Sequence, residues 1–203
     1  MLMPRIQQHF VGGADLQYQC AQALGPALEA AAATLLQGLT SGGKVLVWGS
    51  GAAAALAQAF VAQLVGRFER ERPELAALAL GTNPVLASTS PTLAEAAAWP
   101  TLRQLRALGL PGDVLVLLGA GQPGPDALAL VQAAHEREMA VVALTGARAG
   151  ELPDTLRDAD VWVAVPTERP ARVLEAQLVA LHALCDALDA QLLGDDDMET
   201  ASA

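Results

Sequence analysis

A glycine-rich loop at residues 119–124, with the sequence GAGQPG, is the part of this chain best suited to bind a ligand. The loop follows an apolar stretch that predicts a β-strand and precedes a predicted helix that begins near Pro125. Backbone N–H groups at a helix N-terminus attract anions, and Ser or Thr hydroxyls usually add hydrogen bonds to a bound phosphate. Because this loop contains no hydroxyl, the sequence predicts an anion site that relies on backbone donors. Its candidate ligand-binding residues are Gly119, Gly121, Gln122 and Gly124.

A second glycine turn, Gly49-Ser50-Gly51, follows the apolar stretch 44–48 and opens an alanine-rich helical pattern that continues to about residue 68. A strand, a glycine turn and a helix form the first half of a nucleotide-binding type of α/β unit. In parallel sheets, ligands bind beyond the carboxyl ends of the strands, where the strand order switches. We therefore expect both glycine turns to face one site, although a tight turn needs glycine whether or not a ligand binds.

Five apolar stretches of strand length alternate with helical patterns along the chain. The predicted strands are residues 44–48, 75–80, 114–118, 140–144 and 161–165. The predicted helices are residues 4–39 with a break at 25–26, 51–68, 93–108 with a kink or restart at Pro100, 127–138 and 170–193. Strands that are apolar on both faces are typical of a parallel sheet covered by helices on both sides. We predict an α/β fold, a three-layer α/β/α sandwich around a five-stranded parallel sheet.

The chain shows no linker-like stretch and no repeat of fixed period, which predicts a single domain over residues 1–203. Its expected parts are an N-terminal helical segment (1–40), an α/β core (41–169), a long C-terminal helix (170–194) and an acidic tail (195–203).

The composition argues against several classes of protein. The formal net charge of −10 disfavours direct binding to nucleic acid, because such binding needs a basic protein surface. No apolar stretch approaches the ~18 residues of a membrane span, and no secretory signal is evident, so we expect a cytoplasmic protein. The two cysteines, Cys20 and Cys185, lie far apart within apolar helical patterns and are expected to be small buried side chains.

Several longer patterns carry a resemblance to a known family. Residues 42–46 lead into the first glycine turn, residues 66–73 read GRFERERP, and residues 112–115 and 143–146 read GDVL and ALTG. In order and spacing the chain resembles the sugar isomerase (SIS) domains, in the branch that contains phosphoheptose isomerase and the DnaA-initiator-associating protein. The resemblance covers nearly the whole chain, and the RFERERP run is its most specific element.

The enzyme branch interconverts aldose and ketose forms of a seven-carbon sugar phosphate, which requires a general base and a general acid. The resemblance implies that these are a Glu and a His, which bind zinc together with another His and a Gln. Those positions are Gln63, His182, Ala59 and Leu174 here. An amide cannot transfer a proton at neutral pH, and one nitrogen ligand cannot hold zinc. We therefore expect Gln63 and His182 to be vestigial, with no catalytic residue, no metal and no cofactor.

Both ends of the chain resemble the initiator-associating branch most closely, at residues 5–10 and 184–189. In that branch a Leu-Phe pair contacts the replication initiator DnaA, and the pair corresponds to Leu192 and Leu193. These features predict a non-catalytic scaffold that binds DnaA and promotes its assembly at the origin. The alternatives are a phosphoheptose isomerase with a rearranged site, and a sensor that binds a sugar phosphate without chemistry.

Self-association is also expected. The N-terminal helices and the last helix are apolar on more than one face, which is typical of helices buried in a larger assembly. The resemblance implies a homotetramer whose pockets are shared between subunits. Surface ion pairs are expected among Arg67, Glu69, Glu71 and Arg72.

Overall fold

The computed structural model describes residues 2–83, 85–86 and 99–194. Its centre is a five-stranded sheet in the order β2-β1-β3-β4-β5, with every neighbouring pair parallel. The strands are β1 (Val45–Gly49), β2 (Ala77–Ala79), β3 (Val114–Leu118), β4 (Ala140–Gly146) and β5 (Val161–Val165). The predicted five-stranded parallel sheet is therefore confirmed.

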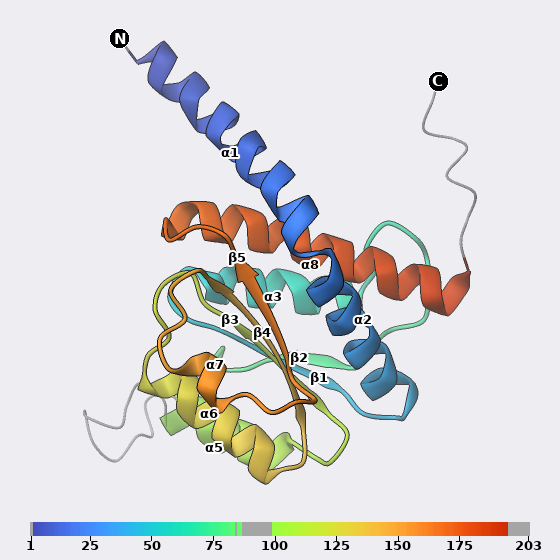
Figure 1. Ribbon diagram of the computed structural model, residues 1–203. Helices are drawn as coiled ribbons and strands as arrows, with labels where there is room; N and C mark the ends of the chain where they lie inside the picture. Colours follow the sequence, from blue (N-terminus) through green and yellow to red (C-terminus); the bar gives the residue numbers. More distant parts are fainter. Residues whose placement is uncertain (1, 84, 87–98, 195–203) are drawn as a thin grey trace.

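Helices cover both faces of this sheet (Figure 1). They are α1 (Met3–Ala23), α2 (Gly25–Thr40), α3 (Ala53–Val65), α5 (Trp99–Leu108), α6 (Pro125–Glu136), α7 (Leu152–Thr155) and α8 (Pro170–Leu193). Helices α2, α3 and α8 lie on one face, and α5, α6 and α7 lie on the other (Figure 1). The predicted three-layer α/β/α sandwich is confirmed.

Strand β3 shows how one apolar stretch builds two cores. Val114, Val116 and Leu118 belong to the cluster that includes α2, α3 and α8. Leu115 and Leu117 belong to the cluster formed with α6. Successive side chains of a strand point to opposite faces, so a strand covered on both sides has to be apolar at every position.

Several element boundaries differ from the predictions. Helix α3 ends at Val65, three residues early, because Gly66 leaves the helical conformation (φ −84°, ψ −107°). Strand β2 keeps only three of the six predicted residues, since it lies at the sheet edge and pairs with β1 alone. The four-residue α7 was not predicted. The break between α1 and α2 is confirmed, whereas residues 93–98 of one predicted helix and the acidic tail lie outside the described residues.

Helix α1 extends away from the sandwich and contacts it mainly through its second half (Figure 1). Leu16 and Cys20 are its buried side chains, whereas Leu2, Ile6 and Phe10 are more than half exposed. Among the described helices, none is long and apolar enough to cross a membrane.

Candidate functional site

The two glycine turns meet at the carboxyl ends of β1 and β3. The Ser50 N–H donates to the Leu118 carbonyl at 2.9 Å. A Cβ placed on Gly119 would lie 3.6 Å from the Ser50 hydroxyl oxygen. From this point the chain continues into α3 on one face of the sheet and into α6 on the other. The turns thus occupy the switch in strand order at which parallel sheets bind ligands.

The loop at residues 119–124 presents unpaired donors. Within the described residues, the backbone N–H groups of Ala120, Gly121, Gln122 and Gly124 have no protein acceptor. Gly124 is the N-cap of α6 and has no side chain with which to cap it. Several free N–H groups before a helix N-terminus favour a bound anion. The exposed Ser50 hydroxyl lies beside this loop.

The glycines of the first turn serve the backbone as well as any ligand. A Cβ at Gly49 would lie 2.3 Å from the Ala53 carbonyl oxygen, so no other residue fits there without a shift of the helix. Gly51 adopts φ +54°, a left-handed conformation that glycine takes without steric cost. In the second loop, the Gln122 side chain packs toward Gly150.

Gln63 and His182 lie on the neighbouring helices α3 and α8. The Cys185 thiol donates to Gln63 Oε1 at 3.6 Å. The His182 ring packs against Phe68, with ring centroids 5.3 Å apart. Both Gln63 and His182 are half-buried, so each keeps some exposure at this surface.

This pair is remote from the glycine turns of the same chain. Helix α3 begins next to the turns at Ala53, and Gln63 lies about 15 Å further along its axis, at ~1.5 Å per residue. Along α8 the separation is shorter, because Gln177 contacts Gly119 and His182 lies about 7.5 Å beyond Gln177, at ~1.5 Å per residue. One chain therefore holds two separate groups: residues 119–124, called the anion loop below after the anion that their free N–H groups favour, and the His182 cluster of Gln63, Phe68, His182 and Cys185.

The residues at the zinc positions do not fit a zinc ion. Ala59 and Leu174 carry no donor atom, and Gln63 offers only an amide. The described part of the chain contains no cluster of three or more His, Cys, Asp or Glu side chains suited to a metal.

Cys185 is expected to make the stability of the protein fall in alkaline solution. Burial raises the pKa of the Cys185 thiol to about 12 from its ordinary 9.0, and the nearby Asp189 carboxylate adds to the rise. An unfolded chain loses this proton near pH 9, whereas the folded chain retains it, so the free energy of unfolding should decrease between pH 9 and 12. Urea unfolding at pH 7.5 and 10.5 measures the decrease.

Cys185→Ala is the matched control, because it keeps every other titrating group. The variant should lose less stability than the wild type over the same pH interval. An equal loss in both proteins would contradict the assignment to this thiol.

The sequence did not identify a buried ion pair beside Gln63. Arg72 Nε donates to Asp189 Oδ1 at 2.6 Å, and the two side chains are 1% and 2% exposed. The same guanidinium donates to the Leu64 and Gln63 carbonyls at 2.8 and 2.7 Å. The surface pair predicted for Arg72 is therefore wrong, whereas Arg67 does pair with Glu71 at the surface. An Asp within the apolar pattern of the last helix was the available signal.

Leu192 and Leu193 end α8 and are 37% and 39% exposed. Their predicted contact with a partner protein stays a prediction.

Comparison with known proteins identifies the family. Residues 10–146 match the SIS domain family, and the chain belongs to it. The chain is similar to a phosphoheptose isomerase from Methylibium petroleiphilum, with 44% identity over 198 residues and 98% coverage of both chains. A phosphoheptose isomerase from Thiobacillus denitrificans is 43% identical, with 97% of this chain and 99% of the relative covered.

Solved structures give the same result for the backbone. A phosphoheptose isomerase from Francisella tularensis matches with a TM-score of 0.87 at 32% identity, covering 93% of this chain and 98% of that one. The enzyme from Neisseria gonorrhoeae matches with a TM-score of 0.83 at 35% identity, covering 94% and 100%.

The predicted function, a non-catalytic scaffold that binds the replication initiator, is wrong. The relatives that match the whole chain at 40–44% identity are named for an isomerase. The scaffold prediction depended partly on likeness at residues 5–10 and 184–189. A match that covers 98% of the chain extends over these ends, so their likeness does not separate the two branches.

Proposed function

We propose that this protein is an aldose–ketose isomerase that acts on a seven-carbon sugar phosphate. The observation that supports the proposal most is the whole-chain likeness, in sequence and in backbone, to proteins named phosphoheptose isomerase. The described site offers backbone donors for a phosphate at residues 119–124 and an imidazole at His182.

The phosphate group of the substrate binds at the loop of residues 119–124. Its oxygens accept hydrogen bonds from the free backbone N–H groups, and the Ser50 hydroxyl adds a side-chain donor. Since the loop carries no hydroxyl of its own, fewer donors reach the phosphate than in a loop rich in Ser and Thr.

Proton transfer falls to His182. Isomerisation moves one proton between C1 and C2 of the sugar and a second between O1 and O2. A base that removes the first proton from one carbon can return it to the other. An imidazole nitrogen can take and release that proton. The Gln63 amide cannot exchange the proton, but its N–H groups can donate to a sugar oxygen. With an amide rather than a carboxylate at position 63, turnover is expected to be slow.

The complete site requires a second copy of the chain. Gln63 lies about 15 Å beyond Ala53 along α3, and His182 lies about 7.5 Å beyond Gln177 along α8, so both residues stand further along their helices than the anion loop of the same chain. We place the loop of one copy beside His182 of another, in the homotetramer that the family resemblance implies.

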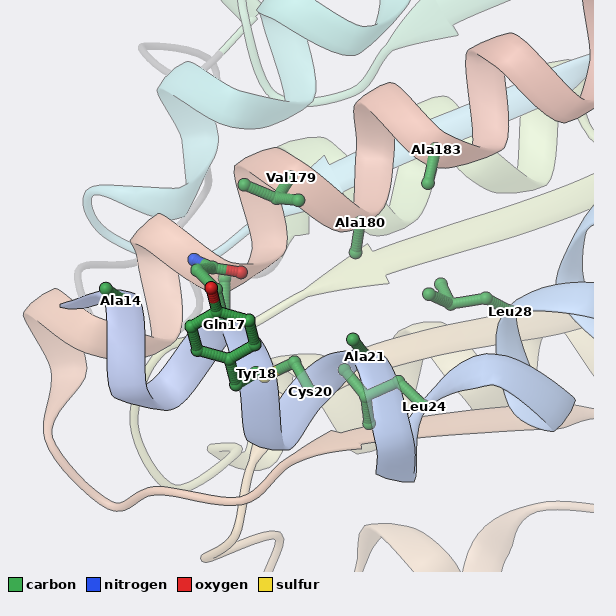
Figure 2. Close-up of a pocket in the computed structure, with 11 residues that line it drawn as sticks. Ala14, Gln17, Tyr18, Cys20, Ala21, Leu24, Leu28, Val179, Ala180 and Ala183 are labelled. Carbon is green, nitrogen blue, oxygen red and sulfur yellow. The ribbon is translucent and has the colours of Figure 1, made fainter.

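Helix α1 offers a surface for this association. Its exposed apolar side chains are 53–77% accessible and comprise Met3, Ile6, Phe10, Val11 and Tyr18. Beside its second half lies an apolar pocket of about 550 Å³. Figure 2 shows Ala180 and Ala183 of α8 along one side of the pocket, and Ala21 of α1 and Leu24, which follows α1, along the other. Such exposed apolar surface is typical of a protein–protein interface.

The double variant Ile6→Ser/Phe10→Ser is expected to form smaller assemblies than the wild type, because it removes two apolar side chains one turn apart on α1. Light scattering after gel filtration measures the mass of each species. Leu110→Ser, which changes an exposed leucine 57% accessible and remote from α1, should leave the assembly intact. A wild-type protein that is monomeric at micromolar concentration would contradict the proposed self-association.

Turnover of sedoheptulose 7-phosphate tests the proposed activity directly. Purified wild type should convert it to the aldose form, and His182→Asn should reduce kcat by about 10²–10⁴ because it removes the base. No turnover by the wild type at substrate saturation would refute the isomerase proposal.

Mixing two inactive variants tests whether the site is shared. His182→Asn removes the base, and Gly121→Asp places a negative charge in the anion loop. Re-assembled mixtures should regain part of the wild-type activity, because some sites combine an intact loop with an intact His182. Mixtures as inactive as the two parents would show that both groups act within one chain.

Binding without turnover is the second candidate, and the amide at position 63 favours it, since Gln63 cannot transfer a proton. A thermal shift with sedoheptulose 7-phosphate but no product would support this candidate.

A further inference from the structure

Gln177 is a fully buried polar side chain beneath the anion loop. It lies on α8, where this helix crosses the carboxyl ends of β3 and β4. Its Nε2 donates to the carbonyls of Gly119 and Leu144, both at 2.9 Å. Because both neighbours are acceptors, only the NH₂ end of the amide can face them. Within the described residues, Gln177 Oε1 has no hydrogen-bond donor.

Gly119 is fixed from three sides. Its N–H donates to the Leu144 carbonyl at 3.0 Å, its carbonyl accepts from Gln177, and its Cα lies beside the Ser50 hydroxyl. In a trans peptide the C=O of one residue and the N–H of the next point in opposite directions. A Gly119 carbonyl held toward α8 therefore turns the Ala120 N–H away from the core, toward the open side of the loop.

The packing of α8 fixes where this amide can reach. One turn before Gln177, Val173 contacts Gly146 so closely that a Cβ on that glycine would lie 2.8 Å from Val173 Cγ2. One turn after it, Leu181 is buried in the same core. A leucine at position 177 would fill this apolar place and avoid the unpaired Gln177 Oε1, but it would leave the Gly119 carbonyl without its donor. What the Gln177 amide adds is therefore its two hydrogen bonds, to the Gly119 and Leu144 carbonyls at the ends of β3 and β4.

We infer that Gln177 is a positioning residue for the anion loop. It holds the Gly119 carbonyl and thereby sets the direction of the first free N–H donor, that of Ala120. The inference rests on the proposed function, in which this loop receives the phosphate of a sugar phosphate. Gln177 touches no substrate in this role and acts only through the backbone of the loop.

Two measurements on Gln177→Met test the inference, since methionine has nearly the same length and no donor. Hydrogen exchange of the Gly119 and Ser50 amides, both bonded in the structure, should accelerate by about 10-fold. The Leu80 amide, which is bonded to the Val47 carbonyl where the chain leaves the edge strand β2, is the control and should be unchanged. The dissociation constant for sedoheptulose 7-phosphate should rise about 10-fold. Gln177→His retains one N–H donor and should recover part of both effects.

The outcomes separate the two proposals. If hydrogen exchange accelerates equally at Gly119, Ser50 and Leu80, the variant is generally destabilised and the positioning role is overturned. Unchanged exchange at Gly119 would also overturn it. A wild type that binds no sugar phosphate would refute the proposed function. The exchange result would then still decide whether Gln177 orders the loop.

Discussion

Gln63→Glu is expected to raise kcat for sedoheptulose 7-phosphate by about 10²–10⁴ over the wild type. The substitution keeps the length of the side chain and replaces an amide with a carboxylate that can take and return a proton. Gln63 is half-buried, and the Cys185 thiol that now donates to its Oε1 can donate to the new carboxylate. A steady-state assay at pH 7.5 measures the change.

Two controls show whether the carboxylate itself causes the gain. Gln63→Met has the same length without a proton-transfer group, and its kcat should not exceed that of the wild type. Adding His182→Asn to Gln63→Glu should remove most of the gain if the two groups work as acid and base. A Gln63→Glu enzyme no faster than the wild type would mean that Gln63 does not lie at the reacting carbons.

Arg72→Met is expected to lower the free energy of unfolding by about 3–5 kcal/mol. The substitution leaves the Asp189 carboxylate buried without its partner, and Asp189 Oδ2 already lacks a donor within the described residues. It also removes the hydrogen bonds that the Leu64 and Gln63 carbonyls accept. Urea unfolding at neutral pH measures the loss.

The double variant Arg72→Met/Asp189→Leu is the control, because it also removes the buried carboxylate that Arg72→Met leaves unpaired. Replacing a whole buried ion pair with apolar side chains is often neutral, so the double variant should recover most of the loss. The two bonds to the carbonyls stay lost, so recovery should be incomplete. If the double variant is as unstable as Arg72→Met, the carboxylate is not the cause. Arg67→Met, which breaks an exposed pair, should cost less than about 1 kcal/mol.

Local patterns were sufficient to predict the sheet and the place of the glycine turns. The continuous apolar run of β3 requires cover on both faces, and the structure supplies two separate cores for it. Gly49 to Gly51 and residues 119–124 meet because the carboxyl ends of parallel strands lie at one edge. The sheet and the turns could be predicted because strand periodicity and glycine turns are patterns among residues close together along the chain.

Contacts between distant parts of the chain were not predictable in this way. Arg72 and Asp189 pair across 117 positions, and Gln177 reaches back 58 positions to Gly119. Neither partner has a local pattern that identifies the other. The separation of Gln63 from the anion loop likewise follows from the lengths and directions of α3 and α8, which become visible only once the helices are packed.

An anion loop built from main-chain donors alone has an uncommon tolerance to mutation. Replacing any residue of the loop, except by proline, leaves its N–H in place, so random substitution erodes such a site far more slowly than one built from hydroxyls. The discrimination that side chains would supply then shifts to the rest of the ligand. Phosphate, sulfate and carboxylate groups would compete for the loop on nearly equal terms. Contacts with the sugar part of the ligand would then have to supply the selectivity.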